Sequence, residues 1–476
     1  MMLTWMRRPG TGAQGPGAPR GAAGAGGWSR RRAFALAGAA AGGAVAAACA
    51  PGGGAPAQPG PNTAADAPAK LLVKIRAGPT YELAFKEGLA QYKQRFPKTE
   101  IDYFPEETGW PEKLLAGWAG GAGADVFQAW DSHFWRFAAN GVIVNINDLL
   151  RDFKKSDLDD FVKGQWAGFQ IPETNIRFGL PTYINTGVLY YNKNTFQKAG
   201  VKEPDATWTY NEYAEASRRL TRIDGGRQVY GAFHPLGKGR IENTMWAHGG
   251  GWVDPKDFKK STGHLPEGQA ALDWVYDRYW KDVSWLPPKQ RPSNFAFFSS
   301  LGDGLFGMAE EGMHALKDVA RVEGMDFDIA QIPRGPKQRM SWITTDGWGL
   351  WSGSSARPQA WEFAKYLASV EWYRIQAQQD LLIPSRLSVI DEWIQILKGR
   401  FPSLQNVNLK GVKDNLAAAP PVVRTWPQYL CAADADKVVN DTLIEIYTDG
   451  TQKPNVFQSR KDQIDVAAAG CGLSLK

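Results

Sequence analysis

Near predicted strand ends of this 476-residue sequence, an aromatic side chain recurs within two residues of a polar side chain that can form hydrogen bonds. These pairs are Trp130 with Asp131, Tyr183 with Asn185, and Asp346 with Trp348. A flat ring covers the apolar face of a small molecule, while a carboxylate or amide bonds the polar groups along its rim. Such pairs would suit a ring that carries hydroxyl groups. Taken singly, each tryptophan is more simply a core or surface residue, so the recurrence of the pairing favours a site.

The elements that position these side chains alternate between strands and helices. Strands are predicted at 71–77, 99–104 and 125–129, and helices at 81–96, 110–118 and 133–140. This alternation indicates parallel βαβ units and an α/β lobe. Ligands of open α/β sheets bind beyond the carboxyl ends of the strands, which points to residues 76–80 and 130–132.

The stretch 177–221 organises the rest of the chain. The Gly179-Leu180-Pro181 turn is followed by a polar aromatic bend at 182–185 and a buried strand at 186–192. A helix follows, and Thr209 caps a second helix that directs Tyr213, Ala216 and Leu220 inward. We expect the bend to be a hinge, because a second α/β region begins directly after it.

Several motifs resemble one family. The segment GLPTYINTGVLYYNKNTFQKAG, the Ala124-Asp125-Val126 phrase, the glycine turn flanked by Trp246 and Trp252, and the Pro384-Ser385-Arg386 turn carry the resemblance. Together they resemble the extracellular solute-binding proteins of ABC importers, and in particular the large maltose-binding-protein-like class. The resemblance covers roughly residues 71–389 and becomes loose in the C-terminal helices.

The resemblance implies a two-lobed periplasmic-binding-protein fold of the class II-like kind, with a hinge and an interlobe ligand cleft. It places residues 70–183 plus 329–368 in the N-terminal lobe, and residues 184–328 plus 369–476 in the C-terminal lobe. It also adds Trp246, Trp252 and Arg386 to the expected ligand-binding residues. The implied function is capture of a mono- or oligosaccharide outside the membrane and delivery to ABC permease subunits, by a monomer that is not an enzyme and needs no cofactor.

The N-terminal 49 residues are predicted to be a signal peptide. Arg30-Arg31-Arg32-Ala33-Phe34 resembles the twin-arginine export motif, and Ala46-Ala47-Ala48-Cys49 resembles a lipobox, although leucine is commoner than Ala46 at its position. Lipidation of Cys49 is therefore expected, with plain cleavage near Ala48 as the alternative. Residues 50–69 are rich in glycine, proline and alanine and suit a flexible tether. The protein would then be held at the outer side of the cell membrane.

Charge and cysteine content exclude other classes of function. The formal net charge is +6, but six of the 55 basic residues precede Cys49, where no acidic residue occurs. The remaining 49 basic residues equal the 49 acidic ones, so nothing indicates nucleic-acid binding. Cys431 and Cys471 could pair as a disulfide outside the cytoplasm. The cysteine and histidine spacing shows no metal site.

Three alternatives remain open in the sequence. An exported carbohydrate-active hydrolase would use two carboxylates, for which Glu310 and Asp346 are the nominees. A binding protein for a non-sugar solute or for a signalling receptor would show the same motifs. Residues 302–307 match GxGxxG, but we interpret them as a loop before a helix, because no suitably placed acidic residue follows. Glu310 and Glu311 fit a cleft or a solvated helix start equally well.

Overall fold

The computed structural model describes residues 66–469, apart from 172–173, 255–256, 258, 380–381 and 419–432. The signal peptide, Cys49, most of the tether, and both Cys431 and Cys471 lie outside the described residues. Within the described ranges, no helix is both long and apolar enough to cross a membrane.

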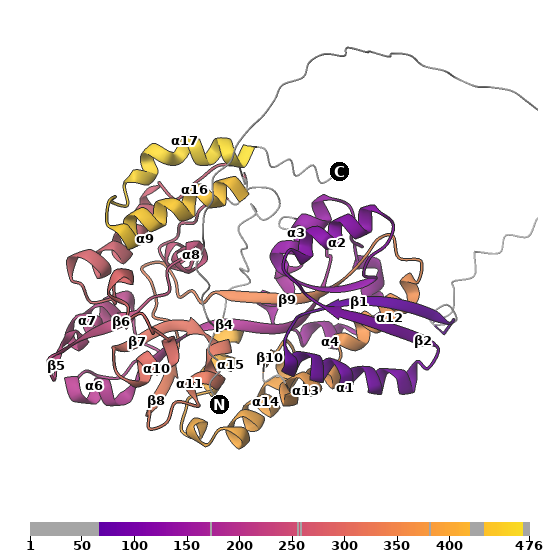
Figure 1. The fold of residues 1–476 in the computed structure, drawn as a ribbon, viewed down its shortest axis with the longest axis horizontal. Helices are drawn as coiled ribbons and strands as arrows, with labels where there is room; N and C mark the ends of the chain where they lie inside the picture. The colour runs from indigo at the N-terminus through magenta and orange to yellow at the C-terminus, as the bar shows by residue number, and fades with distance from the viewer. Residues whose placement is uncertain are drawn as a thin grey trace, which may run out of the picture. The chain divides into compact units, whose positions relative to one another are not determined.

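The central element is β4 (Leu180–Asn192), a continuous strand of 13 residues that belongs to two groups of strands (Figure 1). Its first part, to Thr186, pairs with β9 and β10, and its second part, from Gly187, pairs with β7 and β8. The bend expected at 182–185 is therefore wrong. Strands on both sides give this segment backbone partners, so it stays extended, and only a register shift between Pro181 and Ile184 interrupts the pairing.

The first lobe contains the strands that pair with the first part of β4 and the strands that are joined to these by further pairing. They are β1 (Ala69–Ile75), β2 (Thr99–Pro105), β3 (Val126–Trp130), β9 (Ile343–Leu350) and β10 (Ile383–Pro384). The β1–β2 and β1–β3 pairs are parallel, as the βαβ pattern predicts, while β9 is antiparallel to β3. The second lobe contains β5 (Arg222–Asp224), β6 (Arg227–Phe233), β7 (Phe306–Gly312) and β8 (Phe327–Ala330).

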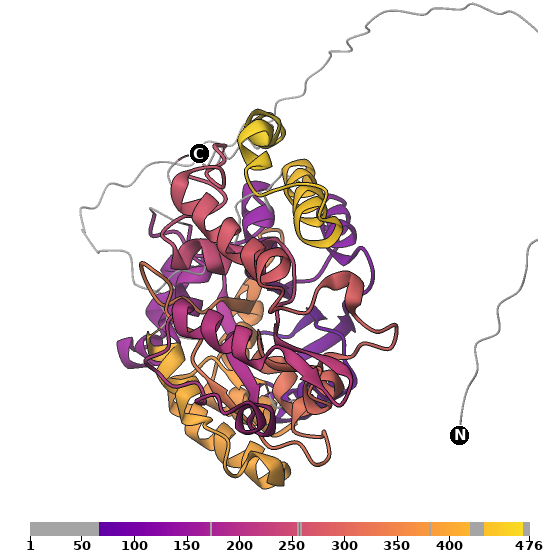
Figure 2. The same ribbon diagram turned by 90° about the vertical axis from the view of Figure 1, so that its left-hand side faces the viewer.

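Helices cover these strands. The helices are α1 (Pro79–Arg95), α2 (Trp110–Ala119), α3 (Asp131–Ala139), α4 (Lys155–Asp159), α5 (Lys163–Gly168), α6 (Lys193–Ala199), α7 (Tyr210–Leu220), α8 (Lys238–Ala247), α9 (Pro266–Tyr276), α10 (Phe297–Gly302), α11 (Leu316–Val319), α12 (Arg357–Leu367), α13 (Val370–Gln379), α14 (Leu387–Arg400), α15 (Lys410–Ala418), α16 (Ala433–Ile444) and α17 (Val456–Ala469). The last two helices lie side by side, as Figure 2 shows in yellow.

Local sequence explains α7 particularly well. Thr209 and Glu212 form a reciprocal capping box at its start, and Tyr213, Ala216 and Leu220 are buried on one face. The predicted cap and inward face are thus confirmed.

The GxGxxG match is not a loop before a helix, because α10 ends at Gly302 and β7 begins at Phe306 after a turn.

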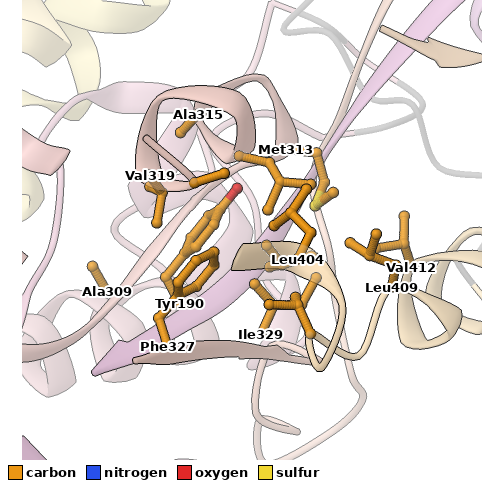
Figure 3. Close-up of a cluster of buried hydrophobic side chains, with 14 of the residues drawn as sticks. Tyr190, Ala309, Met313, Ala315, Val319, Phe327, Ile329, Leu404, Leu409 and Val412 are labelled. Atoms are coloured by element: carbon orange, nitrogen blue, oxygen red, sulfur yellow. The ribbon is translucent and has the colours of Figure 1, made fainter. Parts of the chain in front are cut away.

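The first lobe has a hydrophobic core of its own, while the core around the second part of β4 also includes Ala377 of α13 and Ile383 of β10. In the second lobe, Tyr190 of β4 packs among Val319, Phe327 and Ile329, and its hydroxyl donates a hydrogen bond to the Gly312 carbonyl at 3.0 Å (Figure 3). Burial of such large apolar side chains is the main stabilising contribution to this lobe.

The lobe boundaries differ in detail from the expected ranges. Trp372 and Tyr373, expected in the C-terminal lobe, pack in the first-lobe core with Phe85 and Val73. Since α13 lies against α1, the first lobe extends past the boundary expected at residue 369. The chain returns from the second lobe between β8 and β9, later than the boundary expected at residue 329.

Candidate functional site

Charged side chains meet at the carboxyl ends of the first-lobe strands. Lys74 is the penultimate residue of β1, Arg76 directly follows that strand, Glu106 follows β2, and Trp130 ends β3. Because β1 is parallel to both neighbours, these strand ends share one edge of the sheet. The strand-end rule predicted residues 76 and 130 from sequence, and the structure brings them together with Asp346, which pairs with Trp130 across β3 and β9.

Lys74 is a buried cation with two hydrogen-bond acceptors and an aromatic ring beside its ammonium group. Its Nζ donates to the Gln128 carbonyl and to Glu106 Oε2, both at 2.8 Å, and lies 3.5 Å from the ring centroid of Trp110. Burial lowers the pKa of Lys74, and Glu106 opposes that shift. The positive charge of the Lys74 ammonium group is therefore compensated by the Glu106 carboxylate within the protein.

Three aromatic side chains, Trp110, Trp130 and His133, lie beside this ion pair, and we call them the aromatic ledge. The rings of Trp110 and His133 lie 4.6 Å apart between centroids, and those of Trp130 and His133 lie 5.6 Å apart. Burial, with smaller effects of Lys74 and Arg136, lowers the pKa of His133 to about 4, so the imidazole is neutral near pH 7. Trp130 is 52% exposed and is the one exposed tryptophan among the residues that the structure describes. Its indole offers an open apolar face at the strand ends.

Asp346 connects the ledge to β4. The Tyr183 side chain forms a hydrogen bond with its carboxyl group, and the Arg76 guanidinium carbon lies 5.1 Å from the Tyr183 ring centroid. Burial raises the pKa of Asp346 to about 6, although Tyr183, Arg76 and Lys74 each oppose this shift. Gln165 holds the two strands here, since its Nε2 donates to the Tyr183 carbonyl at 2.7 Å and to the Asp346 carbonyl at 3.3 Å.

The raised pKa of Asp346 predicts a pH dependence of stability. A carboxyl group whose pKa is higher in the folded state binds more protons there than in the unfolded chain. Its contribution to the free energy of unfolding therefore falls as pH rises from about 4 to about 6. Asp346→Asn should give a flatter stability profile in this window, measured by urea unfolding at several pH values. Identical profiles for the variant and wild type would contradict the assignment.

Next to this cluster, Asn185 of β4 contacts His314, which follows β7 of the second lobe. Asn185 Nδ2 lies 3.0 Å from His314 Nδ1, and Asn185 Oδ1 accepts a hydrogen bond from the His314 backbone at 3.1 Å. Burial lowers the pKa of His314, and Arg240 and Arg76 act in the same direction. His314 thus lies within electrostatic reach of a first-lobe arginine as well as of its own lobe. Asn185 and Tyr183 were predicted, whereas His314 was not.

Trp348 is a core residue, which corrects its expected place under a ligand. Its indole is 1% exposed and packs near Phe85, with ring centroids 6.4 Å apart. On β9, Asp346 and Trp348 face the same side, but Trp348 lies deeper below α1 and α12 in the first-lobe core. Aromatic type and strand position could not distinguish these two depths.

Trp252 and Trp246 also lie in packed interiors. The Trp252 Nε1 donates to the Lys238 carbonyl at 3.1 Å, and its ring lies 5.3 Å from that of Phe457. Trp246 is buried with Tyr210 and Met340. Both side chains belong to the second-lobe interior, so the expectation that they contact a ligand is corrected.

Arg386 has a structural set of partners. Its Nε and Nη2 donate to the Ala368 carbonyl at 2.9 and 2.7 Å, and its Nη1 donates to the Asp157 carbonyl at 2.7 Å. The guanidinium also lies over the Phe161 ring. It joins the end of α12 to α4 and α14, and this corrects its expected ligand-binding role. Asp131 begins α3 directly after Trp130, and its role in ligand binding stays a prediction.

Sequence reasoning missed Lys74, Trp110, His133 and Gln165. Lys74 had a usable signal, because a lysine within the apolar strand LLVKI requires a buried partner. The other three come from helices whose orientation depends on packing. No group of three or more histidine, cysteine, aspartate or glutamate side chains among the described residues could hold a metal ion.

Comparisons with known proteins agree with this architecture. A sequence model of the bacterial extracellular solute-binding protein family matches residues 77–373. A putative binding protein of Brucella abortus is 22% identical over 289 residues, which cover 57% of this chain and 65% of that relative. The match thus spans just under two thirds of the relative's length.

Two solved structures show the same fold. An ABC substrate-binding protein from Listeria monocytogenes in complex with cycloalternan gives a TM-score of 0.68 at 20% identity, covering 84% of this chain and 99% of that chain. The sugar-binding protein MalE from Xanthomonas citri gives a TM-score of 0.68 at 18% identity, covering 84% of this chain and 98% of that chain. The predicted two-lobed periplasmic-binding-protein fold is confirmed. Since the family match spans more than half of the sequence, the chain belongs to the bacterial extracellular solute-binding protein family.

Proposed function

We propose that this protein captures a carbohydrate outside the cytoplasm and delivers it to an ABC importer. Family membership supports the binding role, and the site supports the class of ligand. The solved relatives from Listeria monocytogenes and Xanthomonas citri are described as a complex with cycloalternan and as a sugar-binding protein. A small neutral solute with an apolar face and a hydroxyl rim would meet the Trp130 indole and the polar groups beside it.

The pairing of charges at the site carries this proposal. Lys74 is paired with Glu106 at 2.8 Å, and Arg240 of the second lobe is paired with Glu311 at 2.5 Å. Arg76 and Asp346 also act on each other, as the pKa of Asp346 shows. An ionic ligand would have to compete with these pairs, whereas hydroxyl groups can bond them without separating them. The arrangement therefore favours a neutral polyhydroxylated ligand.

A thermal-shift screen of neutral mono-, di- and trisaccharides, together with glycerol phosphodiesters and amino acids, tests this proposal. A ligand that binds only the folded protein raises its stability by about 2.7 kcal/mol at one hundred times its Kd. We expect a saccharide to raise the melting temperature and the ionic solutes to leave it unchanged. A shift caused only by the ionic solutes would contradict the carbohydrate assignment.

The hydrolase alternative finds little support in the positions of its nominated carboxylates. Glu310 lies on β7 in the second lobe, and Asp346 lies on β9 in the first. The pKa of Glu310 responds to burial and Arg240, whereas that of Asp346 responds to burial, Tyr183, Arg76, Lys74 and Glu106. A glycosidase needs both carboxyl groups across one scissile bond. Product analysis after incubation with the bound saccharide would reveal hydrolysis.

We further propose that Cys49 is lipidated and that residues 50–69 tether a monomeric binding domain to the membrane. The support is the sequence pattern alone, since Cys49 and residues 50–65 precede the described part of the chain. Cys49→Ala should leave the protein uncleaved or soluble, whereas the wild type should partition into detergent. Detergent partition of the variant equal to that of wild type would contradict lipidation at Cys49.

A further inference from the structure

One stretch of the chain departs from its overall balance of charge. From Trp393 to Lys413 there are four basic residues and no acidic residue, although the chain after Cys49 contains equal numbers of both. The stretch includes the end of α14, a short 3-10 turn at Pro402–Leu404 and the start of α15. A local excess of positive charge in an otherwise neutral chain indicates a surface that favours an anionic partner.

Contacts join this stretch to α11 and the residues that follow it. Ser403 Oγ donates a hydrogen bond to the Ala320 carbonyl at 2.7 Å, and the Arg321 guanidinium carbon lies 5.4 Å from the Phe401 ring centroid. Lys317 of α11 lines a small cavity together with side chains of α14. The three helices α11, α14 and α15 therefore contribute to one continuous surface.

Four cations of this surface make no ion pair with an acidic side chain among the described residues, and we call them the basic surface: Lys317, Lys398, Arg400 and Lys410. Lys398 and Arg400 donate instead to the backbone carbonyls of Gln405 and Gln378, both at 2.9 Å. Three acidic side chains beside the basic surface are compensated by other cations, in the pairs Asp318–Arg321, Asp391–Lys413 and Glu392–Arg374. The positive charge of the four cations is thus available to a partner.

The basic surface lies toward one end of the molecule. Arg400 and Lys410 are exposed, and Lys317 and Lys398 are half-buried. Two views agree that α14 lies opposite to α16 and α17 (Figures 1 and 2). Residues 433–469, which contain α16 and α17, include seven acidic and four basic residues. An anionic surface would therefore attract the α14 end of the molecule and repel the α16–α17 end.

We propose that the basic surface rests on the anionic headgroups of a lipid membrane. Phosphate oxygens of such headgroups accept hydrogen bonds from lysine and arginine side chains, which need no fixed geometry to reach them. An extended layer of negative charge suits cations that are distributed over α11, α14 and α15, whereas a small anion would need cations that converge on one point. The inference goes beyond solute capture, because it concerns the orientation of the whole domain.

The proposed anchor at Cys49 would bring a membrane within reach of the basic surface. Gln359 Nε2 donates to the Ala67 carbonyl at 3.1 Å, so the described chain begins beside α12. The residues between Cys49 and Asp66 can span roughly 60 Å when fully extended. The radius of gyration expected for a domain of this size is about 21 Å. The tether is therefore long enough for the domain to turn the basic surface toward the lipid, and it keeps the headgroups at a high effective concentration.

Vesicle sedimentation with the chain from residue 50 onward tests the contact in the absence of the lipid anchor. This form contains every residue that the structure describes and lacks the signal peptide and Cys49. The vesicles consist of phosphatidylcholine alone or of phosphatidylcholine with about one third phosphatidylglycerol, at low ionic strength, where charges are least screened. The test variant combines Lys317→Gln, Lys398→Gln, Arg400→Gln and Lys410→Gln.

The matched control removes the same number of positive charges elsewhere on the surface. It replaces with glutamine four exposed lysines that each pair with an acidic residue within four positions along the chain, which are Lys155, Lys202, Lys281 and Lys437. The melting temperature and the saccharide affinity of each variant are measured alongside, and both should stay close to those of wild type.

The wild type and the control should sediment with the anionic vesicles and remain in solution with the neutral ones. The test variant should bind the anionic vesicles about a hundredfold more weakly, because each cation near an anionic membrane contributes roughly a fivefold change. If the fourfold variant does not fold, Arg400→Gln combined with Lys410→Gln should still weaken binding by about twentyfold.

Equal sedimentation of the test and control variants would overturn the proposal, and so would equal binding of the wild type to neutral and anionic vesicles. If the wild type binds soluble polyglutamate but no vesicle, the basic surface serves an acidic polymer and the membrane contact is wrong. Saccharide titration is read separately, so a failure of the carbohydrate assignment would leave the vesicle result unchanged.

Discussion

Replacing Trp130 with alanine is expected to weaken saccharide binding by about thirtyfold or more without lowering the free energy of unfolding. Aromatic platforms that a ligand buries commonly contribute about 2 kcal/mol or more, and each 1.4 kcal/mol changes affinity tenfold. The Trp130 indole is half exposed in the free protein, so its removal creates no core cavity. The effect should therefore be confined to binding.

Two further variants make the Trp130 prediction specific. Trp130→Phe keeps a flat ring and should retain much of the affinity. Ile223→Ala removes another exposed apolar side chain, on β5 in the second lobe, and should bind as wild type does. Calorimetric titration and urea unfolding of all three variants provide the measurements. Unchanged affinity in Trp130→Ala would remove this indole from the site.

Trp348→Ala, by contrast, should reduce the free energy of unfolding by about 3–5 kcal/mol. The Trp348 side chain is buried in the first-lobe core near Phe85, and its truncation leaves a cavity that the surrounding strands and helices fill only in part. Any loss of binding should follow from the loss of folded protein. At temperatures where the variant remains folded, its affinity should be close to that of wild type.

Urea unfolding of Trp348→Ala and Trp348→Phe tests this second prediction. The phenylalanine variant should lose less stability, because it keeps more of the buried volume. A stable Trp348→Ala protein with strongly weakened binding would show that the indole contacts the ligand after all.

Sequence periodicity and strand-end position predicted much of the fold and part of the site. The parallel βαβ order placed Trp130 and residue 76 at one edge of the first sheet, and the structure has them there. Tyr183 and Asp346 were each predicted from a separate motif, and a hydrogen bond between their side chains joins them in the structure. These successes share a cause, since strand order and direction follow from local pattern.

The missed features depend on packing between distant segments. Asp346 and Trp348 share one face of β9. Only Trp348 lies deep in the core below α1 and α12, whereas the Asp346 carboxyl group reaches the site. The bend expected at 182–185 is extended because β9 and β10, more than 150 residues later in the chain, pair with it. Similarly, the role of Arg386 depends on the Ala368 and Asp157 carbonyls, which no local pattern identifies.

Isothermal titration calorimetry with the best saccharide of the panel, followed by chromatography of the recovered sugar, tests the central claim most directly. The account predicts saturable binding of one ligand per chain, heat that is lost in Trp130→Ala, and recovery of the sugar unchanged. Absence of saturable heat with every saccharide, or recovery of a cleaved product, would contradict it.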